Sequence, residues 1–247
     1  MKRKFKDPAP GKLVNVNGHD LHVYTEGTGE NTFVFMSGSG TRFPTLDFKP
    51  LWSILSVNHK IAVIEKAGYG WSDITKSSRD LDTMLDESRE ALKLAGLTAP
   101  YILVPHSMSG LEAVYWGQKY SDEVKAIIGL DPAVPEFYEK AKLVNTIAFL
   151  SRYDILTPDM VNELRCVKNN AVKVKNNPVP AHIPTYFFIS NGKGTPVPVK
   201  DWEEVLVSYL THFKIKKHMS LDCGHYVHTH ETEKIASEIK SFIEDVL

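Results

Sequence analysis

The sequence YILVPHSMSGLEAVYWGQKY, residues 101–120, decides which fold class this chain can adopt. Its first five residues form a short apolar run, which is typical of a strand buried on both faces of a sheet. Its last ten residues have a helical pattern, and residues 106–110 (HSMSG) form the turn between the two. A serine at such a turn, here Ser107, is held above the sheet near the helix N-terminus, where the helix dipole favours negative charge. We therefore expect chemistry at the carboxyl ends of the strands.

Four other segments repeat this short apolar form. They are residues 31–36 (NTFVFM), 60–65 (KIAVIE), 124–130 (VKAIIGL) and 183–190 (IPTYFFIS). Ahead of them, apolar residues alternate on both sides of Asn17-Gly18, a pair that favours the type I′ turn of a β-hairpin. Helical apolar spacing over residues 81–95 and 235–246 lies between and after the strands. This order predicts an α/β fold with a mostly parallel central sheet, flanked by helices and entered through an antiparallel hairpin.

Residues 135–180 interrupt the alternation of strands and helices. They have helical apolar spacing but no strand-like run, and the Asn-, Pro- and Lys-rich residues 173–182 (KVKNNPVPAH) are typical of a linker back to the next strand. We expect a small helical cap here, inserted after the sixth strand. The α/β core then comprises residues 12–134 and 181–247, and the basic residues 1–11 are expected to form a disordered leader.

The composition of the chain disfavours several classes of protein. A chain of 247 residues with 43% hydrophobic and 24% charged residues is typical of an ordinary globular protein. Its formal net charge of -1 favours neither nucleic acid nor an anionic membrane as a partner. Cys166 and Cys223, without a CxxC motif, argue against a disulfide scaffold or a structural zinc site and fit a reducing compartment. Nothing in the composition indicates an oligomeric state.

The N-terminal residues lack the apolar core that a signal peptide needs, and no run of about 18 apolar residues occurs in the sequence. We therefore expect a cytoplasmic protein. The alternative is the soluble part of an exported or membrane-anchored protein whose N-terminal segment has been removed.

Four segments resemble, in order and spacing, the motifs of the α/β-hydrolase fold superfamily, in particular its serine esterase and lipase branch. Residues 33–41 (FVFMSGSGT) are similar to a strand and loop in which members of the family usually have His-Gly. Residues 65–73 (EKAGYGWSD) are similar to its Asp-Arg-x-Gly-x-Gly-x-Ser segment. Residues 106–110 are similar to its nucleophile turn, and residues 222–243 to its C-terminal Gly-His and following helix. The resemblance implies the fold of that family and leaves the substrate open.

The nucleophile turn departs from the family pattern at two positions. Pro105 and Ser109 stand where the usual motif has glycine, which lets the strand and the helix pass each other closely. Serine is a mild change, whereas the proline ring occupies space that a glycine leaves empty.

The resemblance implies roles for four residues. Ser107 matches the nucleophile, His225 matches the general base, and the backbone N–H groups of Ser39 and Met108 match the oxyanion hole. A serine hydroxyl is a poor nucleophile until a neutral imidazole takes its proton. A tetrahedral intermediate then needs fixed donors at its oxyanion, each worth roughly 3 kcal/mol. A serine nucleophile disfavours epoxide hydrolases and haloalkane dehalogenases, which resemble this fold but use aspartate there.

The histidine also needs an acid that fixes its tautomer. Most family members carry this acid after the strand that follows the cap, but Asn191, Gly192 and Lys193 occupy that place here. Asp131 ends a neighbouring strand and keeps the chain order of serine, acid and histidine. We therefore predict that Asp131 is the acid, with Asp201, expected to cap a helix, as the alternative.

These residues predict a hydrolase that cleaves a carboxylic ester or thioester through an acyl-enzyme on Ser107. The expected partner is a small-molecule ester that is hydrophobic on one side, because the cap carries apolar residues. They are Val144, Ile147, Phe149, Leu150, Tyr153 and Leu156. Packing within the cap itself explains these residues equally well. We expect no cofactor. We also expect no metal, since His225, His228 and His230 have no nearby cluster of acids or thiolates.

Three alternatives use the same fold. An aminopeptidase-like amide hydrolase would need acidic groups in the cap, for which Glu136, Glu139 and Asp154 are candidates. A hydroxynitrile lyase would use the same three residues with different pocket groups. A non-catalytic ligand-binding member is expected if Pro105 distorts the turn, or if Asp131 only ends a strand and the chain has no acid.

Overall fold

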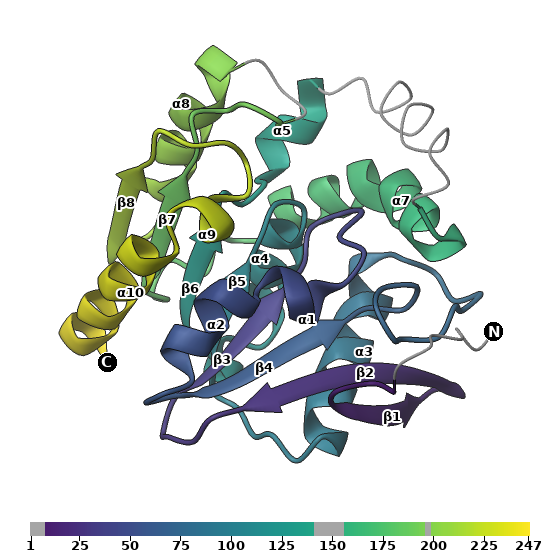
Figure 1. The fold of residues 1–247 in the computed structure, drawn as a ribbon. Coiled ribbons are helices and arrows are strands. Elements are labelled where there is room, and N and C mark those ends of the chain that lie inside the picture. Colours follow the sequence, from purple (N-terminus) through teal and green to yellow (C-terminus); the bar gives the residue numbers. More distant parts are fainter. Residues whose placement is uncertain (1–7, 141–155, 196–198) are drawn as a thin grey trace.

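A computed structural model of the chain describes residues 8–140, 156–195 and 199–247. Within them, eight strands form one sheet in the order β1-β2-β4-β3-β5-β6-β7-β8 (Figure 1). β2 runs antiparallel to its two neighbours, and the strands from β4 to β8 run parallel to one another. The strands are β1 Lys12–Val16, β2 His19–Glu26, β3 Thr32–Met36, β4 Lys60–Glu65, β5 Tyr101–Pro105, β6 Val124–Leu130, β7 Thr185–Ile189 and β8 Lys216–Ser220. The predicted mostly parallel sheet is confirmed.

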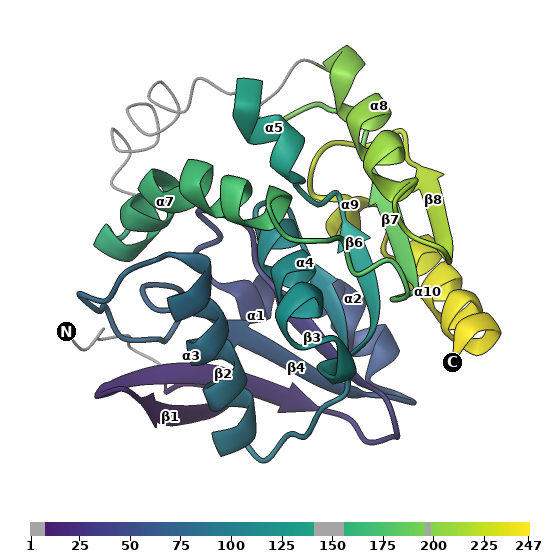
Figure 2. The ribbon, with the colours of Figure 1, turned by 180° about the vertical axis from the view of Figure 1, so that it is seen from behind.

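Helices cover both faces of this sheet. They are α1 Pro44–Asp47, α2 Lys49–Leu55, α3 Leu81–Leu94, α4 Ser109–Lys119, α5 Pro135–Lys140, α7 Pro158–Lys175, α8 Val199–Leu210, α9 Val227–His230, α10 Thr232–Val246 and the 3-10 helix η1 Ser121–Glu123. One face carries α1, α2, α9 and α10 (Figure 1), and the other carries α3, α4 and α8 (Figure 2). Phe33 and Phe35 of β3 pack on the first face, and Val34 and Met36 on the second. The strand is therefore buried on both faces, as predicted.

The antiparallel entry into the sheet is the predicted hairpin. Val16 pairs with His19 across a two-residue loop. Asn17 and Gly18 in that loop have φ values of 50° and 84°, and a type I′ turn requires positive φ at both positions. The turn therefore sets the register of β1 and β2.

The sequence patterns do not predict β8, α1 or α2. β8 is the edge strand beside β7 and has the sequence KKHMS, four of whose five residues are exposed, so it carries no apolar run. α1 and α2 are short and each contains a proline in its first turn, a residue that reads as a helix breaker outside that position. In the part of the chain that the structure describes, no helix is long and apolar enough to cross a membrane.

The segment for which a cap is predicted contains α5 and α7. Outside the described residues lie Val144, Ile147, Phe149, Leu150, Tyr153 and Asp154, as does the side chain of Glu139. Most of the predicted leader, residues 1–7, also lies outside them. The boundaries of the cap and of the leader therefore stay predictions.

Buried polar contacts attach α7 to the core. The side-chain oxygen of Asn170 accepts from the N–H of Leu81 at 3.1 Å, and its amide donates to the carbonyl of Arg79 at 3.2 Å. The guanidinium of Arg79 donates in turn to both carboxylate oxygens of Glu87, at 2.8 and 2.7 Å. Arg79, Asn170 and Glu87 are all buried, so this ion pair lies beneath the helix rather than at the surface.

Replacement of Glu87 by alanine is expected to lower the free energy of unfolding by about 3–5 kcal/mol, because it leaves the Arg79 charge buried without its partner. Urea denaturation measures this loss. Glu90→Ala on the same helix, α3, is the matched control, since Glu90 makes an exposed contact with Lys93 at 3.7 Å. We expect a change below about 0.5 kcal/mol for the control. Equal losses in the two variants would contradict the assignment of a structural ion pair.

Candidate active site

Ser107 lies at the turn between β5 and α4, with a backbone φ of 54°. Positive φ is uncommon outside glycine, and such strained residues cluster at functional sites. The N–H of Gly110 donates to the Ser107 carbonyl at 2.9 Å. The hydroxyl of Ser109 lies 2.6 Å from the Met36 carbonyl and 2.8 Å from the His106 carbonyl. The serine that replaces the usual glycine therefore ties this turn to β3.

Pro105 is accommodated because the pairing of β5 with β6 is interrupted beside it. The two strands pair from Tyr101 to Leu103, and again at His106, which lies opposite Leu130. Proline has no N–H to donate, so it is tolerated where a ladder is broken. The turn after it remains closed, with the N–H of His106 donating to the carbonyl at the end of β3 at 2.9 Å.

His225, in the loop between β8 and α9, lies beside Ser107. Its Nε2 is 2.9 Å from the Ser107 hydroxyl oxygen, and its Nδ1 is 2.6 Å from Oδ2 of Asp131. A carboxylate can only accept, so the proton is assigned to Nδ1 and the lone pair of Nε2 faces the serine. The structure therefore brings these three predicted residues together in one chain of hydrogen bonds.

The carboxylate of Asp131 is fully buried and meets four donors. Oδ1 accepts from the N–H of Ser190 at 2.8 Å and from the indole N–H of Trp202 at 2.7 Å. Oδ2 accepts from the hydroxyl of Ser190 at 2.7 Å and from His225. These donors replace the water that an ionised carboxylate loses on burial. The acid at the end of β6 is therefore fully partnered.

The turn that carries Asp131 is joined to the turn that carries Ser107. Asp131 also has a positive φ, 48°. Two residues later, the N–H of Ala133 donates to the Ser107 carbonyl at 2.7 Å. Because β6 lies between β5 and β7, Asp131 emerges between Ser107 on one side and Ser190 on the other. Strand order therefore brings the acid and the serine together.

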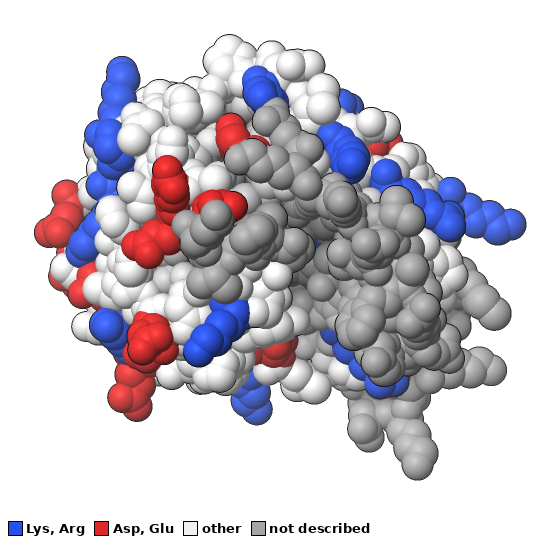
Figure 3. Space-filling view, turned by 90° about the horizontal axis from the view of Figure 1, so that it is seen from above, with Lys and Arg blue, Asp and Glu red and all other residues white. Residues whose placement is uncertain are grey.

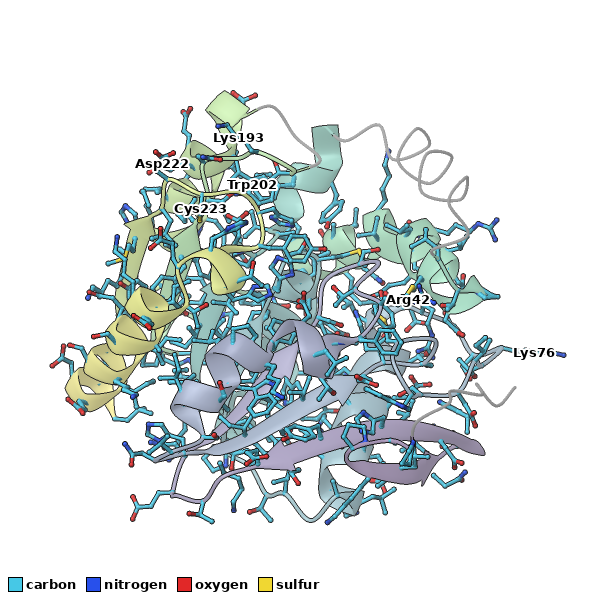
Figure 4. All side chains as sticks on the ribbon, in the orientation of Figure 1. Arg42, Lys76, Lys193, Trp202, Asp222 and Cys223 are labelled. Atoms are coloured by element: carbon cyan, nitrogen blue, oxygen red, sulfur yellow. The ribbon has the colours of Figure 1, made fainter. Side chains whose placement is uncertain are left out.

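Asp201, the alternative acid, lies in the first turn of α8. The expectation that it caps this helix is wrong, because the helix already includes Val199. Its neighbour Trp202 is the residue that reaches Asp131. In Figure 4, Trp202 lies close to Lys193, beside β7 and towards α5.

Residues 191–193, where the family usually has its acid, support His225 through the backbone. The carbonyl of Lys193 accepts from the N–H of His225 at 3.0 Å. The side-chain oxygen of Asn191 accepts from the N–H of Lys193 at 3.1 Å, which fixes the loop. The segment thus holds the histidine although it carries no acid of its own.

The loop after β3 lies directly against Ser107. A Cβ added at Gly38 would come within 2.7 Å of the Ser107 Cβ, so the approach is close enough to require glycine there. Ser39 follows in this loop, and Met108 follows Ser107 in the other turn. Both residues predicted to supply oxyanion donors therefore lie on segments that border the serine.

Tyr69 connects this loop to α7. The N–H of Gly70, the next residue, donates to the Arg42 carbonyl at 3.0 Å, just after this loop. The Tyr69 hydroxyl donates to Glu163 of α7, whose other oxygen binds the ammonium of Lys66. Burial, followed by the charge of Glu163, raises the pKa of Tyr69 well above its ordinary value. The hydroxyl therefore stays protonated and keeps its role as donor.

Three histidine rings pack together beside the site. The ring centroid of His106 is 4.7 Å from that of His225 and 4.8 Å from that of His228. Burial, and then the neighbouring His228 and His225, lower the pKa of His106 well below its ordinary value, so its ring is neutral. Its Nε2 lies 3.2 Å from the His225 carbonyl. His230 is exposed, and among the described residues no group of three or more His, Cys, Asp or Glu is arranged to hold a metal ion.

Trp202 and Ser190 complete the surroundings of Asp131 and were not identified from the sequence. A signal for Ser190 exists, because it follows β7, whose Phe188 pairs in parallel with Leu130 of β6. Residues that follow paired positions of parallel strands emerge side by side. Trp202 has no such signal, since it reaches the carboxylate from a helix.

No family model matches the chain. Among curated proteins, the chain is 50% identical over 133 residues to the uncharacterized protein YbdG of Bacillus subtilis (strain 168). This match covers 54% of the chain and 41% of YbdG. The chain is 29% identical over 124 residues to the uncharacterized protein YqjL of the same organism, a match that covers 50% of this chain and 48% of YqjL. The chain thus spans less than half the length of these curated relatives.

Solved structures match nearly the whole chain. An esterase from Thermogutta terrifontis is 17% identical, covers 95% of this chain and 97% of its own, and has a TM-score of 0.71. An enol-lactonase from Burkholderia xenovorans LB400 is 13% identical, with coverages of 94% and 100% and a TM-score of 0.71. The epoxide hydrolase of Bacillus megaterium is 14% identical, with coverages of 94% and 100% and a TM-score of 0.73. At these identities the likeness shows a shared fold, and this chain has the fold of the α/β-hydrolase superfamily.

Proposed function

We propose that this chain is a serine hydrolase that cleaves a carboxylic ester or thioester through an acyl-enzyme on Ser107. One observation carries the proposal: the hydrogen-bond chain from Asp131 through His225 to Ser107, with distances of 2.6 and 2.9 Å. A nucleophile within reach of a base that a third group orients is the arrangement that acyl transfer requires.

In the first half of the reaction, Ser107 Oγ bonds to the acyl carbon while its proton passes to Nε2 of His225. The π electrons of the carbonyl move onto its oxygen. The resulting oxyanion accepts hydrogen bonds from the backbone N–H groups of Ser39 and Met108. The bond to the leaving alcohol or thiol then breaks, and His225 gives that group the proton. Asp131 stays ionised and stabilises the imidazolium throughout.

In the second half, water takes the place of the leaving group. The oxygen of the water bonds to the acyl carbon while His225 accepts a proton from the water. A second oxyanion then forms beside the N–H groups of Ser39 and Met108. When the bond to Ser107 breaks, the serine recovers its proton from His225 and the carboxylic acid leaves. The two halves use the same groups in opposite order.

The proposed substrate carries an apolar group on one side. Among the apolar residues predicted for its pocket, Leu156 is described, and it approaches the loop that contains Ser39: a Cβ on Gly40 would lie 3.5 Å from Leu156 Cδ2. The face above the strand ends carries basic and acidic side chains together (Figure 3). The described part of this face, outside the grey residues, therefore gives no strong field of one sign that would steer an ionic substrate.

An aminopeptidase-like amide hydrolase is the alternative. It would need carboxylates beside the pocket to hold an α-amine, and among its three candidates Glu136 has a described side chain. The charge of Glu136, after burial, helps to raise the pKa of Tyr209 on α8. Turnover of an aminoacyl amide, compared with that of the matching ester, separates the two functions.

Fluorophosphonate labelling, read by intact mass, tests the proposed function. We expect one adduct on the wild-type protein, placed on Ser107 by peptide mapping, because these reagents react with activated serines. Ser107→Ala is expected to remain unlabelled. Ser53→Ala is the control, since Ser53 is an exposed serine of α2 that donates to the Pro50 carbonyl, and it should label like wild type. A folded wild-type protein that takes up no label would refute the proposal.

A further inference from the structure

Trp202 is a buried residue that touches two members of the proposed catalytic group. Its indole N–H donates to Oδ1 of Asp131 at 2.7 Å, and only 1% of its surface is exposed. Its ring meets the ring of His225 edge to face, with centroids 5.7 Å apart and planes at 88°. The same side chain therefore contacts both the acid and the base.

The indole also packs against α5. Phe137 stacks on it with a centroid distance of 4.1 Å and an interplanar angle of 5°. A stacked pair of this kind adds about 0.5–1.5 kcal/mol to the gain from burial. Trp202 thus packs against both Phe137 and His225, and these contacts fix the direction of its N–H.

The two oxygens of Asp131 are used differently. Oδ1 meets two backbone or indole N–H groups, from Ser190 and Trp202, which can only donate. Oδ2 meets His225 and the hydroxyl of Ser190. Because Asp131 is fully buried, no bulk water can replace a donor that is removed. The loss of the Trp202 N–H would leave Oδ1 with one donor instead of two.

We propose that Trp202 is a positioning residue of this hydrolase. Its N–H holds the carboxylate of Asp131 in the rotation that presents Oδ2 to His225, and it takes up part of the negative charge that the imidazolium would otherwise meet. The proposal rests on the proposed function and adds a residue from α8 to the site. It also connects the acid to α5, the first helix of the predicted cap, through Phe137.

Trp202→Phe is the variant that tests this role, because phenylalanine can keep the stack on Phe137 but has no N–H. With one donor fewer, the carboxylate retains more charge and stabilises the protonated form of His225. On the acid side of the pH–rate profile, the midpoint, which is the pH at which the labelling rate falls to half its maximum, should then rise by roughly one unit. Labelling below that midpoint should slow by about tenfold.

The other groups around His225 stay the same in this variant. They include Ser107, Asp131, the neutral His106 that follows β5, and Tyr226, whose ring centroid lies 5.9 Å from that of His225. A shift of the profile is therefore attributable to the lost N–H. Lost packing alone would lower stability without moving the midpoint.

Trp116→Phe is the matched control. Trp116 is also fully buried, and its indole N–H donates to the carboxylate of Glu123 at 2.9 Å. Its ring packs against Tyr101 at the start of β5, whereas Ser107 follows the end of that strand. We expect this variant to keep the wild-type profile. If Trp202→Phe does not fold, Phe137→Leu takes its place. That variant keeps the N–H but loosens the ring, and it should shift the midpoint in the same direction by a smaller amount.

The experiment compares the pH dependence of the fluorophosphonate labelling rate in the wild-type protein, Trp202→Phe and Trp116→Phe. A midpoint that rises in Trp202→Phe alone supports the proposal, and a folded Trp202→Phe protein with the wild-type profile overturns it. Absence of label on the wild-type protein instead refutes the proposed function. The NMR signal of the His225 Nδ1 proton then decides the role of Trp202 without any reaction. It should move in Trp202→Phe and not in Trp116→Phe, and an unchanged signal overturns the proposal.

Discussion

Replacement of Ser107 by alanine is expected to reduce the turnover of an activated ester such as a p-nitrophenyl acyl ester by about 10⁶-fold. The variant loses the hydroxyl oxygen on which the proposed acyl-enzyme forms, while His225 and the predicted oxyanion donors remain. A small residual rate above that of water is expected from those groups. Steady-state kinetics at saturating substrate measure the loss, with mock-purified protein to set the background.

The fold of the Ser107→Ala protein should be intact. Alanine keeps the Cβ that already tolerates a φ of 54° at this position, and the hydroxyl has His225 as its described partner. We expect the free energy of unfolding to change by less than about 1 kcal/mol. A folded Ser107→Ala protein that retains more than about one hundredth of wild-type turnover would show that another group is the nucleophile.

The sequence predicts those elements in which the pattern of apolar and polar side chains follows their burial in the fold. β3 and β6 are continuous apolar runs because both faces are covered, and the Asn17-Gly18 hairpin follows from the φ values that its turn requires. β8 escapes prediction because it is an edge strand whose lysines remain in water. Its existence depends on pairing with β7, a contact between distant segments that periodicity does not encode.

In the candidate site, too, local patterns identify some residues, and packing between distant segments determines the others. Ser107 and His225 can be identified because local motifs surround them, and Asp131 because a parallel sheet places strand ends side by side. Trp202 cannot, since its contact with Asp131 depends on how α8 packs over β7. Asp201, next to Trp202 in sequence, has the carboxylate that suggests a catalytic acid, but it lies in the first turn of α8. Sequence shows which groups can react, and packing decides which of them meet.

Replacement of Asp131 by asparagine is expected to reduce turnover by about 10⁴-fold. The structure determines how the new amide must orient. The site of Oδ1 is faced by two groups that can only donate, the N–H of Ser190 and the indole of Trp202, so the amide oxygen takes that site. The amide nitrogen then points at His225, where the hydroxyl of Ser190 can turn to accept from it.

An N–H that faces Nδ1 requires a lone pair there, so the proton of His225 moves to Nε2. The histidine then offers the hydroxyl of Ser107 a donor where an acceptor is needed, and it cannot take the serine proton. Asparagine tolerates positive φ well, so the fold should survive the change at Asp131. Asp201→Asn is the matched control and should stay within about twofold of wild type, as expected for a surface change. If Asp201→Asn instead lost activity while Asp131→Asn kept it, the acid would be Asp201.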